Sequence, residues 1–192
     1  MSHLDHDPWV DVKTFHGLKA DLVISSLQKE IRRGNVENAC LLAYEMIITS
    51  PALEDYLWLR LKVISVEDIG FGEPLAPVVV QSLFAMNDAC DRSTGERKLY
   101  AIHATRYLCQ CKKDRSSDEM INWIIHSSEQ GKVMPQIPEY ALDMHTAEGK
   151  KMGRGRRHFF EVASKITPEL PGRDKTYLER IMQMLDNGEL ED

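Results

Sequence analysis

Motifs for nucleotide, metal and hydrolytic chemistry are missing from this sequence of 192 residues. It has no GxxxxGK(S/T) loop to hold phosphates, no GxGxxG turn for a dinucleotide, and neither the HExxH pattern of zinc proteases nor the GxSxG pattern of serine hydrolases. These absences exclude the common designs for ATPases, dehydrogenases, metalloproteases and esterases. We therefore expect no cofactor, no metal centre and no catalytic residues of these types.

Long apolar runs and cysteine pairs of the metal-binding type are missing too. No apolar run approaches the roughly 20 residues that a membrane-spanning helix needs, and the first ten residues lack the basic-then-apolar order of a secretion signal. Of the four cysteines, Cys109 and Cys111 are separated by one residue, whereas zinc and redox motifs have two. We therefore predict reduced thiols and a cytoplasmic protein that does not enter membranes.

The residues that are present are typical of a globular protein. Hydrophobic residues make up 43% of the chain and charged residues 28%. This length is sufficient for one substantial domain, or for one domain with an appendage. The formal charge of -6 argues against a protein that coats nucleic acid along its whole surface, although it is compatible with a local basic patch.

Apolar residues recur with helical spacing along most of the chain. The run at about 54–69 is apolar on most sides, as a central helix should be, and the run at 75–90 is apolar over more than one stripe. Ser93 and Ser116 each begin a Ser-x-x-Glu pattern that is typical of a helix start. We predict an all-α helical bundle, organised as an N-terminal lead (1–17), a bundle (18–130), a loop-rich basic crossover (131–173) and a terminal helix with an acidic tail (174–192).

Three segments, in order, resemble one known family. They are ISSLQKEIRRGNVENACLLAYEMI at 24–47, RLKVISVEDIGFGEPLA at 60–76 and GERKLYAIHATRYLCQCKKD at 95–114. Together they are similar to the C-terminal region of the RarA/MgsA family of clamp-loader-like AAA+ ATPases. The resemblance extends over residues 18–155 and includes a Glu-Asp-Ile-Gly turn that ends at Gly70.

The resemblance implies a helical bundle like the clamp-loader collar, through which subunits assemble. The ATPase module that hydrolyses nucleotide in the family has no counterpart in this sequence. The expected function is a non-catalytic oligomerisation or adaptor module in the context of DNA replication and repair. Expected partners are further copies of the chain, as a dimer or tetramer, and an AAA+ ATPase or a single-strand-binding protein.

The turn at 67–70 raises a question about charge. Glu67 and Asp68 come at the end of a helical run that stops at Gly70, although the end of a helix carries a partial negative charge that disfavours acids. We predict a structural role, in which both acids accept hydrogen bonds from outside their own helix. The donors could be the free amides at the start of the next helix, or arginine side chains, namely Arg60 or one of Arg154, Arg156 and Arg157.

The tract KKMGRGRRH at 150–158 is the main local concentration of positive charge. It suggests a phosphate or nucleic-acid binder as an alternative function, because arginines and exposed loop amides both attract phosphate. The same side chains also suit pairing with the carboxylates of this acidic chain. The residues that would contact a phosphate or a partner protein are Lys150, Lys151, Arg154, Arg156 and Arg157.

A second alternative is a small enzyme. Asp143 and His145 are spaced to act as an acid/base pair or as two metal ligands, and Glu139 and Glu148 lie close in sequence. A metal- or acid/base-dependent enzyme would be centred on Asp143 and His145, with the basic tract beside it.

Overall fold

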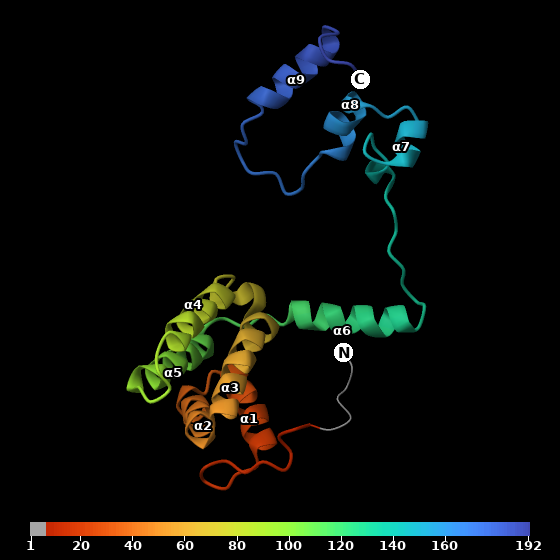
Figure 1. Ribbon diagram of the computed structural model, residues 1–192. Helices are drawn as coiled ribbons and strands as arrows, with labels where there is room; N and C mark the ends of the chain where they lie inside the picture. The colour runs from red at the N-terminus through yellow and green to blue at the C-terminus, as the bar shows by residue number, and fades with distance from the viewer. Residues whose placement is uncertain (1–6) are drawn as a thin grey trace. The chain divides into compact units, whose positions relative to one another are not determined.

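The computed structural model describes residues 7–192, so the first six residues of the expected N-terminal lead lie outside the described residues. The described chain is all helical, as the apolar periodicity predicts, and its β structure is limited to an isolated bridge between Lys13 and Lys19. By contacts it separates into two units, Met1–Lys132 and Val133–Asp192 (Figure 1). The second unit contains residues 133–173 of the predicted loop-rich segment and the predicted terminal helix, whereas residues 131 and 132 belong to the first unit.

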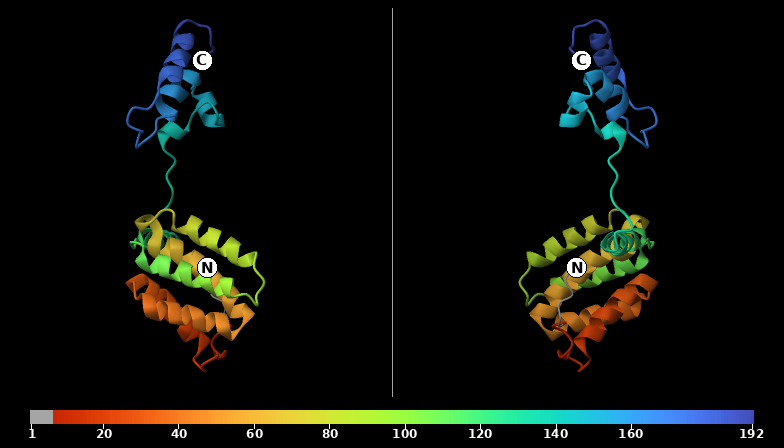
Figure 2. Two further views of the ribbon diagram at one scale, coloured as in Figure 1. Left: turned by 90° about the vertical axis from the view of Figure 1, so that its left-hand side faces the viewer. Right: turned by 90° about the vertical axis from the view of Figure 1, so that its right-hand side faces the viewer.

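Five helices of the first unit pack together as a bundle. Helix α1 packs on α2, α2 on α5 and α5 on α4, and α3 contacts all four (Figure 2). Helix α5 also contacts the other four, so the predicted central helix α3 shares the centre of the bundle with α5. The bounds of the five helices are α1 (Ala20–Arg33), α2 (Val36–Thr49), α3 (Pro51–Ile64), α4 (Ala76–Asp88) and α5 (Gly95–Gln110).

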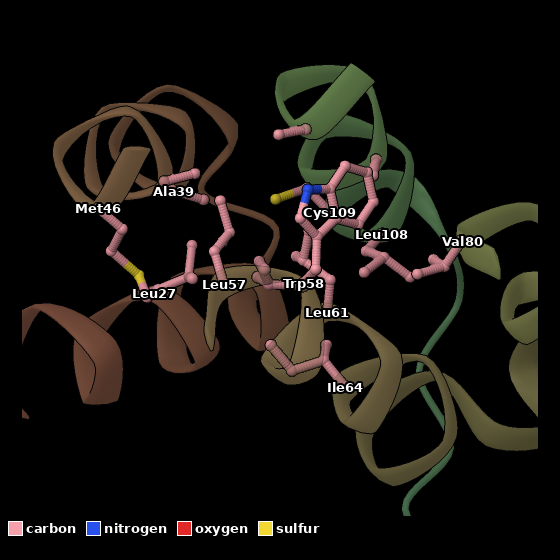
Figure 3. Close-up of a cluster of buried hydrophobic side chains, with 14 of the residues drawn as sticks. Leu27, Ala39, Met46, Leu57, Trp58, Leu61, Ile64, Val80, Leu108 and Cys109 are labelled. Atoms are coloured by element: carbon pink, nitrogen blue, oxygen red, sulfur yellow. The ribbon is translucent and has the colours of Figure 1, made fainter. Parts of the chain in front are cut away.

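The core forms around the buried side chains of α3. Leu57 points toward Leu27 of α1, and Trp58 points toward Leu108 and Cys109 of α5 (Figure 3). Burying one such side chain contributes about 1.5–3 kcal/mol. Contacts on several sides explain why the sequence of α3 is apolar nearly all round.

One buried ion pair joins three helices of this core. Arg97 of α5 is 5% exposed, and its Nε donates to Glu54 Oε1 of α3 at 2.7 Å. Its Nη1 donates to the carbonyl oxygens of Asn87 in α4 and of Cys90 just beyond it, at 2.8 and 2.9 Å. Because every charged group here has a close partner, Arg97 holds the ends of α4 and α5 against α3.

Helices α5 and α6 begin within two residues of the predicted positions, but the capping residues differ from the prediction. At α6 (Ser116–Glu129) the Ser116 side chain does not cap the helix; Asp114 Oδ1 accepts the Ser116 N–H at 2.9 Å. At α5, Asp91 Oδ1 likewise accepts the Ser93 N–H at 2.8 Å. In both places the aspartate two residues before the serine accepts the serine N–H, and this hydrogen bond fixes the turn that leads into the helix.

The chain between α3 and α4 is not regular helix. The predicted helix at 54–69 ends at Ile64 and continues as a π-helical turn, η1 (Ser65–Ile69), followed by a 3-10 turn, η2 (Gly70–Gly72). Helix α6 contacts η1 and extends away from the bundle of α1–α5 (Figure 1). The site described below lies where α6 meets η1.

The second unit contains short helical segments. Thr146 caps α7, because its hydroxyl accepts the Gly149 N–H at 3.0 Å. Of residues 133–192, only Leu185 is a buried hydrophobic residue, and it is 8% exposed. The segments are η3 (Glu139–Ala141), α7 (Ala147–Lys151), α8 (Arg156–His158), which runs directly into the π-helical turn η4 (Phe159–Ala163), and α9 (Thr176–Asp186).

Candidate functional site

Asp68 lies in the π-helical turn η1 and is completely buried. Its carboxylate accepts a hydrogen bond from Arg32 Nε of α1 and another from Gln28 Nε2 at 2.8 Å. Arg115 Nη1, just before α6, lies 3.6 Å from Asp68 Oδ1. A buried charge is stable only when it is paired and hydrogen-bonded, and these three partners meet that condition.

Glu67 uses the same partners from a position closer to solvent. Its Oε1 accepts from Gln28 Nε2 at 2.8 Å and from Arg32 Nη2 at 3.3 Å, and Arg115 Nη2 lies at 3.9 Å. Arg60 contacts the acids only indirectly: its side chain donates a hydrogen bond to Gln28 Oε1, and Gln28 donates to both carboxylates. We call this group, Gln28, Arg32, Arg60, Glu67, Asp68 and Arg115, the acidic-turn cluster.

The partners of the two acids differ from those named by the sequence. Arg60 reaches Gln28 instead of either carboxylate. The observed arginine partners are Arg32 and Arg115, and for Arg115 the sequence offers no local signal. For Gln28 and Arg32 a signal exists: they are four residues apart on one helical face, beside the buried Leu27 and Ile31.

Two glycines allow the turn to pack closely against the segment before α6. Gly70 has a positive φ of 49°, and a Cβ there would lie 2.4 Å from the carbonyl oxygen of Asp114. At Gly72 a Cβ would lie 2.5 Å from the carbonyl oxygen of Lys112. The Asp114 N–H also donates to the carbonyl oxygens of Asp68 and Ile69. These contacts position Arg115 and the start of α6 beside the acids.

Arg115 also pairs with Asp118 in the first turn of α6. This hydrogen bond raises the pKa of Arg115 above its ordinary value, and the charges of Asp68 and Glu67 act in the same direction. The cluster therefore connects α1, η1 and α6 through fixed charges. It is a structural joint that sets the direction of α6.

An apolar hollow of about 450 Å³ lies beside this joint. Its apolar lining comes from Val63, Val66 and Ile121, so it lies between the end of α3 and the first turns of α6. A neighbouring hollow of about 190 Å³ is lined by Val66, Phe71, Pro74 and other residues near η2. The apolar surface thus runs from α6 across η1 toward α4.

Helix α6 itself has no buried residue. Met120, Ile121 and Ile124 share one face, and Trp123 borders it; all four are exposed, Met120 to 61% and Trp123 to 56%. In soluble monomers large apolar residues of this kind are usually scattered singly. Here they are gathered on one helix.

Asp143 and His145 do come together, in a turn ahead of α7. Asp143 Oδ2 lies 3.1 Å from His145 Nδ1, and Asp143 Oδ1 accepts the His145 N–H at 2.9 Å. These hydrogen bonds hold the pKa of Asp143 below its ordinary value. The His145 ring is mostly exposed and stacks edge-on with Phe159 at 5.0 Å. Both bonds are local and shape the turn.

No third ligand completes this pair: within residues 7–192, no three His, Cys, Asp or Glu side chains gather closely enough to hold a metal ion.

The four cysteines, at positions 40, 90, 109 and 111, are free thiols. Burial raises the pKa of Cys109 to about 11, so this thiol is poorly suited to act as a nucleophile.

The arginines of the basic tract are bonded within the second unit. Arg154 donates to the carbonyl oxygens of Glu139 and Leu142, at 2.7 and 2.8 Å, and to Glu139 Oε1 at 2.6 Å. Arg157 pairs with Asp186 at 2.7 Å. The internal pairing that the sequence left open is therefore present for these two side chains.

No family model matches the chain, and a search of the curated proteins finds no match either. The similarity to the RarA/MgsA family therefore stays a prediction from the sequence. None of the helices formed by residues 7–192 has the length and apolar character required to cross a membrane.

Proposed function

We propose that this chain is a non-catalytic oligomerisation or adaptor module, similar in role to the C-terminal collar of replication-associated AAA+ ATPases. The observation that supports the proposal is the exposed apolar face of α6. Isolated helices of 14 residues are marginal in water, and most helices of proteins are stabilised by packing an apolar face. A face of this kind with no packing partner within the first unit favours a protein partner.

The joint at the base of α6 adds to this argument. The acidic-turn cluster fixes the first turn of α6 through Arg115 and Asp118. The apolar hollow continues the face of α6 onto Val66. An apolar centre surrounded by charged groups is the usual composition of a protein–protein interface.

The resemblance supplies the proposed context, which is DNA replication and repair in the cytoplasm. The partners would be further copies of this chain, as a dimer or tetramer, and an AAA+ ATPase or a single-strand-binding protein. We expect the isolated chain to hydrolyse no ATP, because its sequence has no phosphate-holding loop of the kind that ATPases use.

Light scattering at tens of micromolar protein tests the assembly. We expect a mass of two or four chains for the wild type, where one chain has 22.0 kDa. Ile124→Asn places an amide on the apolar face and should shift the mass toward one chain. His126→Asn places the same residue on the opposite, exposed face of α6 and should leave the mass unchanged.

A wild-type mass of one chain would contradict self-assembly through α6. The adaptor role has a separate test, in which tagged wild type and Ile124→Asn are used to capture proteins from native extract. An AAA+ ATPase or a single-strand-binding protein captured by the wild type and lost with Ile124→Asn is the expected result. Equal capture by both would exclude α6 as the binding surface.

A further inference from the structure

In the second unit the chain turns back on itself after α9. Gly188 has a positive φ of 72°, and the N–H groups of Glu189 and Leu190 donate to the carbonyl oxygen of Met184 at 2.9 and 3.3 Å. This is the usual way in which a glycine ends a helix and reverses the chain. The reversal brings residues 189–192, which we call the acidic segment, to residues 153–157, which we call the arginine loop.

Two polar contacts hold the acidic segment in place, and a third joins the arginine loop to the end of α9. Asp192 Oδ1 accepts the backbone N–H of Arg157 at 2.7 Å, and the carbonyl oxygen of Glu191 accepts from Arg156 Nη1. The Arg157 side chain pairs with Asp186 at the end of α9. A carboxylate bound to a main-chain amide beside an arginine makes a charge-assisted hydrogen bond, which is stronger than a neutral one.

The glycine at position 155 is required by the space that this carboxylate occupies. A Cβ at Gly155 would lie 2.5 Å from Asp192 Oδ1 and 2.5 Å from its carbonyl carbon. The backbone itself does not require glycine, because φ is −100°. The arginine loop is therefore shaped to let an anionic group approach its main chain closely.

Further positive charge surrounds the same place. A hollow of about 340 Å³ is lined by Lys150, Arg156 and Asp192, among other residues. Lys150 is exposed and makes no ion pair within the described chain. Arg154, in contrast, is used to hold the loop against Glu139 and Leu142. The available donors are thus the Arg156 side chain, the Lys150 ammonium and the Arg157 amide.

We propose that the arginine loop is a binding site for a phosphate group, and that the acidic segment occupies it as an internal competitor. A phosphate has more acceptor oxygens and more charge than the Asp192 carboxylate, so it can engage Arg156, Lys150 and the Arg157 amide together. When a competitor occupies the site in most molecules, the apparent affinity for the ligand equals the intrinsic affinity multiplied by the fraction of molecules in which the site is open. Removing the carboxylate should therefore strengthen phosphate binding.

The test measures the affinity of the full chain for two probes at low salt. Binding of inorganic phosphate is followed by NMR at the amides of Gly155 and Arg157. Binding of a fluorescein-labelled single-stranded oligonucleotide is followed by fluorescence anisotropy. We expect Asp192→Ala to bind at least one probe about fivefold more tightly than the wild type. Glu179→Ala removes the same charge from an exposed position on α9 and should leave the affinity unchanged. Adding Arg156→Gln to Asp192→Ala should reverse the gain.

Two results would support the proposal and distinguish the source of the phosphate. Tighter binding of both probes would indicate free phosphate, and tighter binding of the oligonucleotide alone would indicate the phosphodiester backbone of nucleic acid. The proposal is overturned if Asp192→Ala binds neither probe, or if Asp192→Ala and Glu179→Ala change the affinity equally. Circular dichroism of each variant checks that the helices remain.

Discussion

Asp68 has 0% solvent exposure and depends on an arginine that lies 36 residues away in sequence. Replacing it with alanine would leave Arg32 and Arg115 facing each other without the carboxylate between them. Arg32 would keep Glu67 and Arg115 would keep Asp118, but Arg32 and Gln28 would each lose a hydrogen bond to a buried charge. We therefore expect Asp68→Ala to lower the free energy of unfolding by about 3 kcal/mol. Urea denaturation measures this change. The expected loss for Asp68→Ala exceeds the roughly 1–2 kcal/mol that the loss of a helix cap would produce.

Glu67→Ala is the matched comparison. Glu67 has the same partners, but about a quarter of its side chain is exposed, at 26%. Water can replace part of its hydrogen bonding, so we expect a loss of about 1 kcal/mol. Equal losses for the two variants would show that burial does not determine the importance of Asp68.

Glu45 provides the clearest dependence on pH. Burial acts to raise the pKa of this carboxyl, but hydrogen bonds from Thr14 and His16 outweigh it and hold the pKa below the ordinary value of 4.5. A lowered pKa means that the folded state favours the ionised form, so this contribution is full above pH 4.5 and is lost as the pH falls through the lowered pKa. Unfolding free energies measured between neutral and acid pH should therefore decline less steeply for Glu45→Gln than for the wild type. Parallel curves would contradict this assignment.

The sequence indicated correctly that Glu67 and Asp68 need donors outside their own helix, because helix polarity is a local property. It could not identify Arg32 as a hydrogen-bond donor or Arg115 as an ion-pair partner. They belong to segments on either side of the turn in sequence, and only the fold brings their side chains to the two acids. The spacing of Gln28 and Arg32 marks one face of α1, but it does not indicate which acids that face meets.

At the scale of elements, helices were predictable because apolar spacing acts within a few turns. The same spacing could not predict the π-helical turn η1 or the exposure of α6. A π turn depends on one extra residue in a turn, which the apolar pattern at 54–69 does not reveal. The apolar face of α6 looks like any core-facing face, and its exposure becomes visible only when the neighbouring elements are in place.

The end of α5 is held by a lysine, and this contact can be tested directly. Lys113 Nζ donates to the carbonyl oxygens of Leu108 and Cys109, at 2.9 and 3.0 Å, and to that of Cys111. A cation suits the partial negative charge at a helix end. We expect Lys113→Met to lower the free energy of unfolding by about 1–2 kcal/mol. Urea denaturation should show no comparable loss for Lys112→Met, because Lys112 is exposed and its side chain makes none of these bonds.

A larger loss for Lys112→Met than for Lys113→Met would mean that general charge, and not the carbonyl contacts, stabilises this end of α5. The result matters for the site, because residues 112–114 connect α5 to the joint at the base of α6. The carbonyl oxygens of Lys112 and Asp114 lie against Gly72 and Gly70.

At the scale of the whole molecule, the two units have very different cores. Nearly all buried hydrophobic residues belong to the first unit, whereas Leu185 is the one contributed by residues 133–192. The second unit relies instead on polar contacts at the surface, such as the Arg157–Asp186 pair, and exposed pairs of this kind contribute little. Burial of apolar area is the main favourable term in folding, so the second unit should be the less stable of the two.

Hydrogen exchange followed by mass spectrometry can measure this difference. We expect amides of α7 and α9 to exchange much faster than those of α3 and α5, because local opening in the second unit exposes little apolar surface.

Limited proteolysis should cut first at 131–138, where glycine and two prolines form an irregular segment, and should leave a resistant fragment of the first unit. Asp192→Ala should speed exchange at Arg156 and Arg157 without changing exchange in α3. A single exchange rate shared by both units would contradict the expected difference in stability.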